Sequence, residues 1–129
     1  GQSWASAPSS TFYYAAYNRI NTGAPTLSCN SGDVYTLKVG LITADEVEFA
    51  GGKNANNTSY YLYNGQYYWA MSPYWWNGSA GVFGVNPNGH LTGVAVNSTW
   101  GLRPVINLKA DTLFAAGGNG TQSNPYVVS

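Results

Sequence analysis

Charged residues are scarce in this sequence: five Lys and Arg and five Asp and Glu occur among 129 residues, and their charges cancel. Charged residues therefore make up 8% of the chain, against about 25% in ordinary soluble domains. A neutral chain with few cations lacks the counterion release that drives nucleic-acid binding, and it has no basic patch for anionic lipid. We expect no nucleic-acid partner and no direct membrane insertion of this chain.

Cysteine and histidine each occur once, as Cys29 and His90. One cysteine cannot form an internal disulfide, and one residue of each type is too few for a structural zinc site. A nucleophilic or acid–base mechanism would have to use one of these two side chains, and neither has a catalytic partner nearby in the sequence. An exposed imidazole beside a turn and an inert thiol are the simpler interpretations. The sequence thus predicts a protein that is not an enzyme and has no cofactor or metal.

Aromatic residues are abundant, at 16% of the chain, and the polarity comes mainly from Gly, Asn, Ser and Thr. Disordered chains are poor in aromatics, whereas this mixture is typical of extracellular domains rich in β-structure. A chain of 129 residues can bury one self-sufficient core. The sequence contains no signal peptide or transmembrane run and starts at Gly1. We therefore expect a mature or excised domain that is secreted or displayed at a cell surface.

Two short helices are predicted in the first half of the chain. After a polar lead-in over residues 1–10, residues 12–20 carry apolar side chains at helical spacing. Thr43 and Glu46 have the spacing of a capping box, which starts a second helix that ends at the glycines 51–52. The acidic residues of its first turn are explained by the helix dipole, without a bound cation.

The rest of the chain predicts short strands joined by tight turns. Strands are expected over residues 34–42, 60–63, 66–71, 81–85, 91–96 and 101–108. Asn64 and Gly65 form the preferred two-residue hairpin turn, and residues 86–90 form a longer one. Pro104 places the last strand at an edge or bulge. Two helices followed by hairpins predict a single α+β domain, residues 1–129, with a mainly antiparallel sheet.

Arg103 lies inside an apolar strand, between Leu102 and Pro104. Its five donors must be satisfied, and backbone carbonyls or a carboxylate are the simplest acceptors. We interpret Arg103 as a structural clamp and not as a ligand contact.

Aromatic and amide residues gather between residues 74 and 100. Aromatic side chains give stiff contact area and stack on sugar rings, while Asn and Ser give adaptable hydrogen bonds. The alternative is that several of these aromatics belong to the core, and we expect Trp69 and Trp100 to be buried. The predicted ligand-binding residues are Tyr74, Trp75, Trp76, Asn77, Phe83, Asn86, Asn88, His90 and Asn97.

Two separated motifs carry a family resemblance: Trp69-x-x-Ser72-Pro73 and Gly101-Leu-Arg-Pro-Val-Ile-Asn-Leu108. With the segments around them, over about residues 34–128, they resemble the C-terminal domain of bacterial surface proteins that carry a prepilin-type leader. That domain is similar to the C-type lectin-like fold of formylglycine-generating enzymes and of the variable proteins of diversity-generating retroelements. The resemblance implies that Trp69, Ser72, Pro73, Arg103 and Pro104 form a framework and that the stretch between them is a diversified surface.

The sequence also departs from these relatives. The cysteine pair of the formylglycine-generating enzymes has no counterpart, since Cys29 is alone, and the calcium-binding motifs of animal lectins are missing, since Asn86-Pro87-Asn88 lacks the acid. The resemblance therefore implies a non-enzymatic adhesin on a bacterial pilus or cell surface, with a protein or glycan as ligand. The alternative is a pilin-like filament subunit whose aromatics pack against other subunits.

Overall fold

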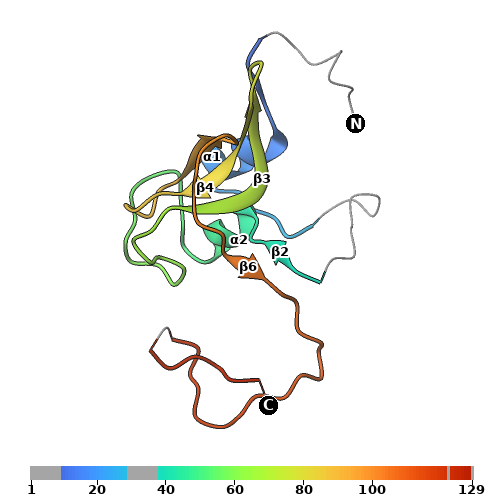
Figure 1. The fold of residues 1–129 in the computed structure, drawn as a ribbon, viewed down its shortest axis with the longest axis vertical. Helices are drawn as coiled ribbons and strands as arrows, with labels where there is room; N and C mark the ends of the chain where they lie inside the picture. Colours follow the sequence, from blue (N-terminus) through green and yellow to red (C-terminus); the bar gives the residue numbers. More distant parts are fainter. Residues whose placement is uncertain (1–9, 29–37, 122, 129) are drawn as a thin grey trace.

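A computed structural model of the protein describes residues 10–28, 38–121 and 123–128. Cys29 lies outside the described residues. The elements are β1 (Phe12–Tyr13), α1 (Ala15–Thr22), β2 (Gly40–Leu41), α2 (Ala44–Phe49), β3 (Tyr68–Trp76), β4 (Ala80–Val85), β5 (Leu91–Ala95) and β6 (Pro104–Val105). Two helices and a curled antiparallel sheet make this an α+β structure, as predicted (Figure 1).

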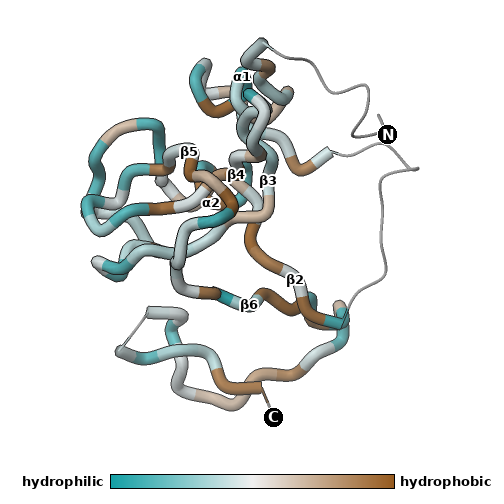
Figure 2. Tube along the Cα trace, turned by 45° about the horizontal axis from the view of Figure 1, so that its top comes forward, coloured by the Kyte–Doolittle hydropathy of each residue, from teal (hydrophilic) through white to brown (hydrophobic). Residues whose placement is uncertain are grey.

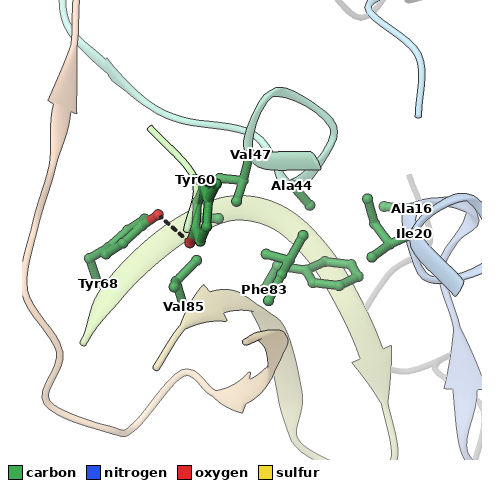
Figure 3. Close-up of a cluster of buried hydrophobic side chains, with 10 residues drawn as sticks. Ala16, Ile20, Ala44, Val47, Tyr60, Tyr68, Phe83 and Val85 are labelled. Atoms are coloured by element: carbon green, nitrogen blue, oxygen red, sulfur yellow. Dashed lines mark hydrogen bonds between the residues drawn. The ribbon is translucent and has the colours of Figure 1, made fainter. Parts of the chain in front are cut away.

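The main sheet has the strand order β1-β3-β4-β5, and each neighbouring pair is antiparallel. β2 and β6 form a separate two-stranded sheet. One face of the main sheet is covered by α1 and α2, whose apolar side chains meet those of β3 and β4 in the core (Figure 3). Tyr68, Ala70 and Ser72 alternate toward this inner face, so Trp69 and Met71 point to the outer face.

A bulge in β3 changes which residues face the core. The register with β4 shifts on both sides of Pro73, where an ordinary strand would need a ladder N–H. Trp69 is opposite Gly84 on the outer face, whereas Trp75 is opposite Gly81, on the same side as Phe83. The shift therefore turns Trp75 inward.

Helix α2 begins as predicted. The Glu46 backbone N–H donates to Thr43 Oγ1 at 3.1 Å, and the Thr43 N–H donates to Glu46 Oε2 at 2.7 Å. The Ala44 N–H donates to the buried hydroxyl of Ser72 at 2.9 Å, which fixes the start of α2 on β3. The capping box of the sequence is confirmed.

Several predicted boundaries were wrong. The first helix covers residues 15–22, because residues 12–13 pair with the end of β3 instead. Residues 60–63 form a turn, not a strand, because Tyr60 enters the core. β3 continues through residue 76, beyond the predicted end at 71.

The predictions for the other strands agree in part. The hairpin of residues 81–85 and 91–96 is confirmed as β4 and β5. Of the strands predicted at 34–42 and 101–108, the described residues contain β2 and β6, of two residues each. Residues 34–37 lie outside the described part of the chain.

After β6 the chain leaves the sheet and ends in a separate loop (Figures 1 and 2). This loop is closed by the Ala115 N–H, which donates to the Val127 carbonyl at 2.8 Å, and by the ring contact of Phe114 with Tyr126. In the described residues, none of the helices has the length and apolar character to cross a membrane.

Candidate ligand-binding surface

The nine predicted binding residues do not share one face. Asn86, Asn88 and His90 lie in the turn between β4 and β5, whereas Asn77 follows β3 at the other end of β4. Asn97 lies near Asn77, because the adjacent Val96 N–H donates to the carbonyl of Ala80. The six residues of β4 separate the two groups by about 17 Å at the rise of a strand. The segment 74–97 therefore presents two separate groups and not one surface.

Phe83 and Tyr74 belong to the interior. The Phe83 side chain is 1% exposed and lies in the core, so it cannot reach a ligand at the surface. Tyr74 is half-buried against it, with ring centroids 4.6 Å apart. Burial is also the main cause that raises the pKa of the Tyr74 phenol, followed by the nearby Tyr17 and Tyr13.

Trp75 packs on the backbone of two strands. A Cβ at Gly81 or at Gly93 would overlap the Trp75 indole, so both glycines provide the space that the ring fills. Trp75 is also edge-on to Tyr74, with centroids 5.0 Å apart. These contacts give Trp75 a packing role in the sheet. Trp76 lies one position further, opposite Ala80, and is half-buried.

The amides of the two turns hold the backbone. Asn86 Oδ1 accepts from the Asn88 N–H at 2.9 Å and from the His90 N–H at 3.2 Å. Asn77 Oδ1 accepts from the Ser79 N–H at 3.3 Å. These are Asx turns, in which the side chain mimics a backbone acceptor. The neighbouring Gly and Pro in the sequence are the signal that could have identified this role.

His90 is held by an amide as well. His90 Nε2 lies 2.8 Å from Asn54 Oδ1, and Asn54 Nδ2 donates to Asn21 Oδ1. This chain links the β4–β5 turn to the end of α1. The imidazole is thus part of a polar network at the surface.

Sequence reasoning missed an aromatic cluster on the outer face of the sheet. Trp69 and Trp100 were predicted to be buried, and they are half-buried there. Trp100 lies on Gly84, where a Cβ would be 2.5 Å from its ring, and its centroid is 5.7 Å from that of Trp69. Tyr67 flanks Trp100 at 4.7 Å and is 50% exposed. We call Tyr67, Trp69 and Trp100 the outer-face aromatic cluster.

The surroundings of this cluster are apolar and uncharged. Met71 and Leu102, its neighbours in the sequence, are exposed, and β3, β4 and β5 contain no charged residue. Gly84 lies beneath Trp100 and lets its ring pack close to the sheet. The strand pairing holds the backbone in place. The cluster is therefore a rigid apolar surface on which a flat, uncharged group can stack.

Arg103 acts as the predicted clamp. Its Nη1 donates to the Leu62 carbonyl, and its guanidinium carbon lies 4.6 Å from the centre of the Tyr68 ring. It thereby ties the turn at residues 60–63 to the start of β3. The Arg103 side chain, which the family resemblance assigns to the framework, thus makes its contacts within the chain.

Among the described carboxylates, Glu48 is the one whose burial is not matched by hydrogen bonds. Its Oε2 is buried without a partner in the described structure. Burial, and then the negative charge of Asp45, raise the pKa of the Glu48 carboxyl. An acid with a raised folded pKa contributes stability below its unfolded pKa, and this contribution is lost as the pH rises through the folded pKa.

Replacing Glu48 by Gln should therefore raise the melting temperature at pH 7, by about 2 °C or more. The gain should shrink toward zero at pH 4, where the wild-type carboxyl is protonated. Thermal unfolding at both pH values checks this result. Glu46→Gln is the matched control: it alters the capping box and should not stabilise the fold. A gain that is equal at both pH values would contradict the assignment.

Within the described residues, no three His, Cys, Asp or Glu side chains gather as metal ligands would. No protein-family model, no curated protein and no solved structure matches the chain significantly. The family resemblance of the sequence therefore stays a prediction.

Proposed function

We propose that this protein is a non-enzymatic binding module of the C-type lectin-like type, displayed outside a bacterial cell as an adhesin. A curled antiparallel sheet with two helices on one face is compatible with that fold. The motifs around Trp69 and Arg103 support the family. The ligand is a protein or a glycan without strong charge.

The observation that carries the proposal is the outer-face aromatic cluster. Soluble proteins rarely hold several large aromatics on an open sheet face unless the face makes contacts, because their burial is worth several kcal/mol. Here Tyr67 is half exposed beside two tryptophans, and the strands beneath are uncharged. The proposed ligand stacks on these rings. Binding then depends on shape and apolar contact, with little electrostatic steering.

The test is a screen of the domain against a glycan array and a panel of surface proteins, followed by Tyr67→Ala. We expect this substitution to weaken binding at least tenfold, since an anchor is worth about 2 kcal/mol. Its thermal stability should change little, because the ring is half exposed. Tyr61→Ala is the matched control: Tyr61 is 68% exposed and lies in the turn of residues 60–63. Equal effects of the two substitutions, or no binding on either platform, would overturn the proposal.

One observation favours the second candidate, a pilin-like filament subunit. The segment after β6 forms a loop apart from the sheet, and hydrophobic residues recur along it (Figure 2). The exposed apolar residues of this segment are Ile106, Leu108, Leu113, Phe114, Tyr126, Val127 and Val128. Contact with a neighbouring subunit would cover them. Filaments seen by electron microscopy, and lost in a chain truncated after residue 105, would support this candidate over the first.

A further inference from the structure

We propose that the β5 edge of the main sheet is a self-association site, at which β5 of a second copy pairs antiparallel to form a continuous eight-stranded sheet. The inference does not depend on the binding function proposed above. It rests on the free backbone groups of this edge and on how they match their own symmetry copies.

β5 is the last strand of its sheet, and within the described residues no further strand pairs with its outer edge. The His90 carbonyl accepts from Asn86, and the Val96 N–H donates to Ala80, so the even-numbered residues here bond to β4. In an antiparallel ladder the alternate residues point the other way. Leu91, Gly93 and Ala95 therefore direct their N–H and C=O groups away from the sheet.

Some of these outward groups are already bonded. The Leu91 N–H donates to the Lys53 carbonyl at 3.0 Å, and the Ala95 carbonyl accepts from the Ser98 N–H at 3.0 Å. Both groups of Gly93 and the N–H of Ala95 have no partner in the described part of the chain. Gly93 is in the middle of β5 and Ala95 is its last residue, so these groups are available to bond with another strand.

The residues of β5 include none of the features that prevent an edge strand from pairing with another strand. Natural edge strands are protected by charged residues, proline or a bulge. β5 reads Leu-Thr-Gly-Val-Ala and is followed by Val96, so it has no charge and no proline, and its register with β4 has no shift. Val96 is 50% exposed. A neutral chain also brings no net repulsion between two copies.

The free groups fit a second copy in one register. A two-fold axis at Val94 places Gly93 of one copy opposite Ala95 of the other, and these residues exchange both hydrogen bonds, four in the dimer. The Ala95 carbonyl can accept a second hydrogen bond, since it has two lone pairs. Val94 then lies opposite its own copy as a non-hydrogen-bonded pair. Its side chain is opposite Val82 and is already buried within one copy, at 8% exposed.

A register shifted toward Leu91 collides with the segment at Lys53. An axis at Gly93 would bring Ala95 of the second copy beside Leu91, where the Lys53 backbone already occupies the edge. With the axis at Val94, the second strand turns away over residues 96–98 before it reaches that point. The chain turn and the Lys53 contact thus select the Val94 register. In this dimer the outer faces of the two sheets would form one continuous surface.

Disulfide trapping tests the register. In a Cys29→Ser background, an equimolar mixture of Thr92→Cys and Val96→Cys chains places two thiols across a non-hydrogen-bonded pair, where Cα atoms lie about 4.5 Å apart and a disulfide fits. Neither side chain is buried within one copy. We expect covalent dimers at least tenfold faster than with Thr92→Cys chains alone, because the proposed register places the two copies of residue 92 far apart. Equal rates for the mixture and for Thr92→Cys chains alone would overturn the proposal.

Sedimentation of the otherwise unmodified protein gives a second measurement. The small edge predicts a weak dimer, with a dissociation constant below about 1 mM. Ala95→Pro removes only an outward N–H, which an edge strand tolerates, so we expect an unchanged circular dichroism spectrum and association weakened at least tenfold. A wild-type sedimentation coefficient that stays constant with concentration, or association that Ala95→Pro leaves intact, would overturn the proposal.

Discussion

Replacing Arg19 by Met should destabilise the fold by about 3 kcal/mol at neutral pH, because a buried carboxylate loses its counter-ion. Asp45 is 4% exposed. Arg19 Nε lies 2.7 Å from Asp45 Oδ1 and Nη2 lies 2.8 Å from Oδ2, a two-pronged pair that joins α1 to α2. The Thr26 N–H, at 3.0 Å from Oδ1, would be the remaining partner. Chemical unfolding of both proteins measures the loss.

The pH dependence identifies the mechanism. Burial on its own raises the pKa of Asp45, but the hydrogen bonds from Arg19 and Thr26, with the Arg19 charge, outweigh it and lower the pKa. A lowered folded pKa gives stability above the unfolded value of about 3.9, and this stability is lost as the pH falls through the folded pKa. Without Arg19, the effect of burial dominates. The pKa of Asp45 is then raised, and its carboxylate destabilises the fold at neutral pH.

The Arg19→Met penalty should therefore be largest near pH 7 and should decrease as the pH falls toward 4. The difference between the two unfolding curves isolates this effect, since Glu48 titrates in both proteins. Lys109→Met, the matched control, removes an exposed cation and should change the unfolding free energy by less than about 0.5 kcal/mol. A difference that does not vary with pH would mean that Asp45 is not the group left unpaired.

This ion pair shows what sequence patterns leave out. The helix start at Thr43 was predictable, because a capping box is a local arrangement of residues three positions apart. The same local logic explained Asp45 by the helix dipole. Its actual partner is 26 residues away and becomes a neighbour only through the packing of α1 on α2. The spacing of residues along the chain does not predict such a contact.

The direction and burial of the aromatic side chains were mispredicted for a related reason. Side-chain direction in a strand alternates, so a bulge at Pro73 reverses the assignment of every residue that follows. Trp75 accordingly packs inward on Gly81 and Gly93. Trp69 and Trp100 were expected to be buried. The pairing of Trp69 with Gly84 and the contact of the Trp100 ring with Gly84 place them on the outer face.

Glycine 89 provides the second large expected effect: Gly89→Ala should cost about 3 kcal/mol or more. Its φ is +71°, a conformation that costs a side chain about 1 kcal/mol. A Cβ would also overlap the Asn57 carbonyl, which is backbone and cannot rotate away. That contact belongs to a loop held on the turn by the Asn57 N–H, which donates to the Asn88 carbonyl at 3.0 Å. The clash therefore separates the turn between β4 and β5 from the loop at Asn57.

Gly65 is the matched control for the backbone conformation. Its φ is +70°, it also follows an Asn in an Asx turn, and a Cβ there would meet only the Tyr63 hydroxyl, at 3.6 Å. Gly65→Ala should therefore cost only the conformational penalty, about 1 kcal/mol. Chemical unfolding of both variants separates the two contributions, and the difference of about 2 kcal/mol is the cost of the Asn57 overlap. Equal losses would mean that the loop at Asn57 moves away from residue 89 without cost.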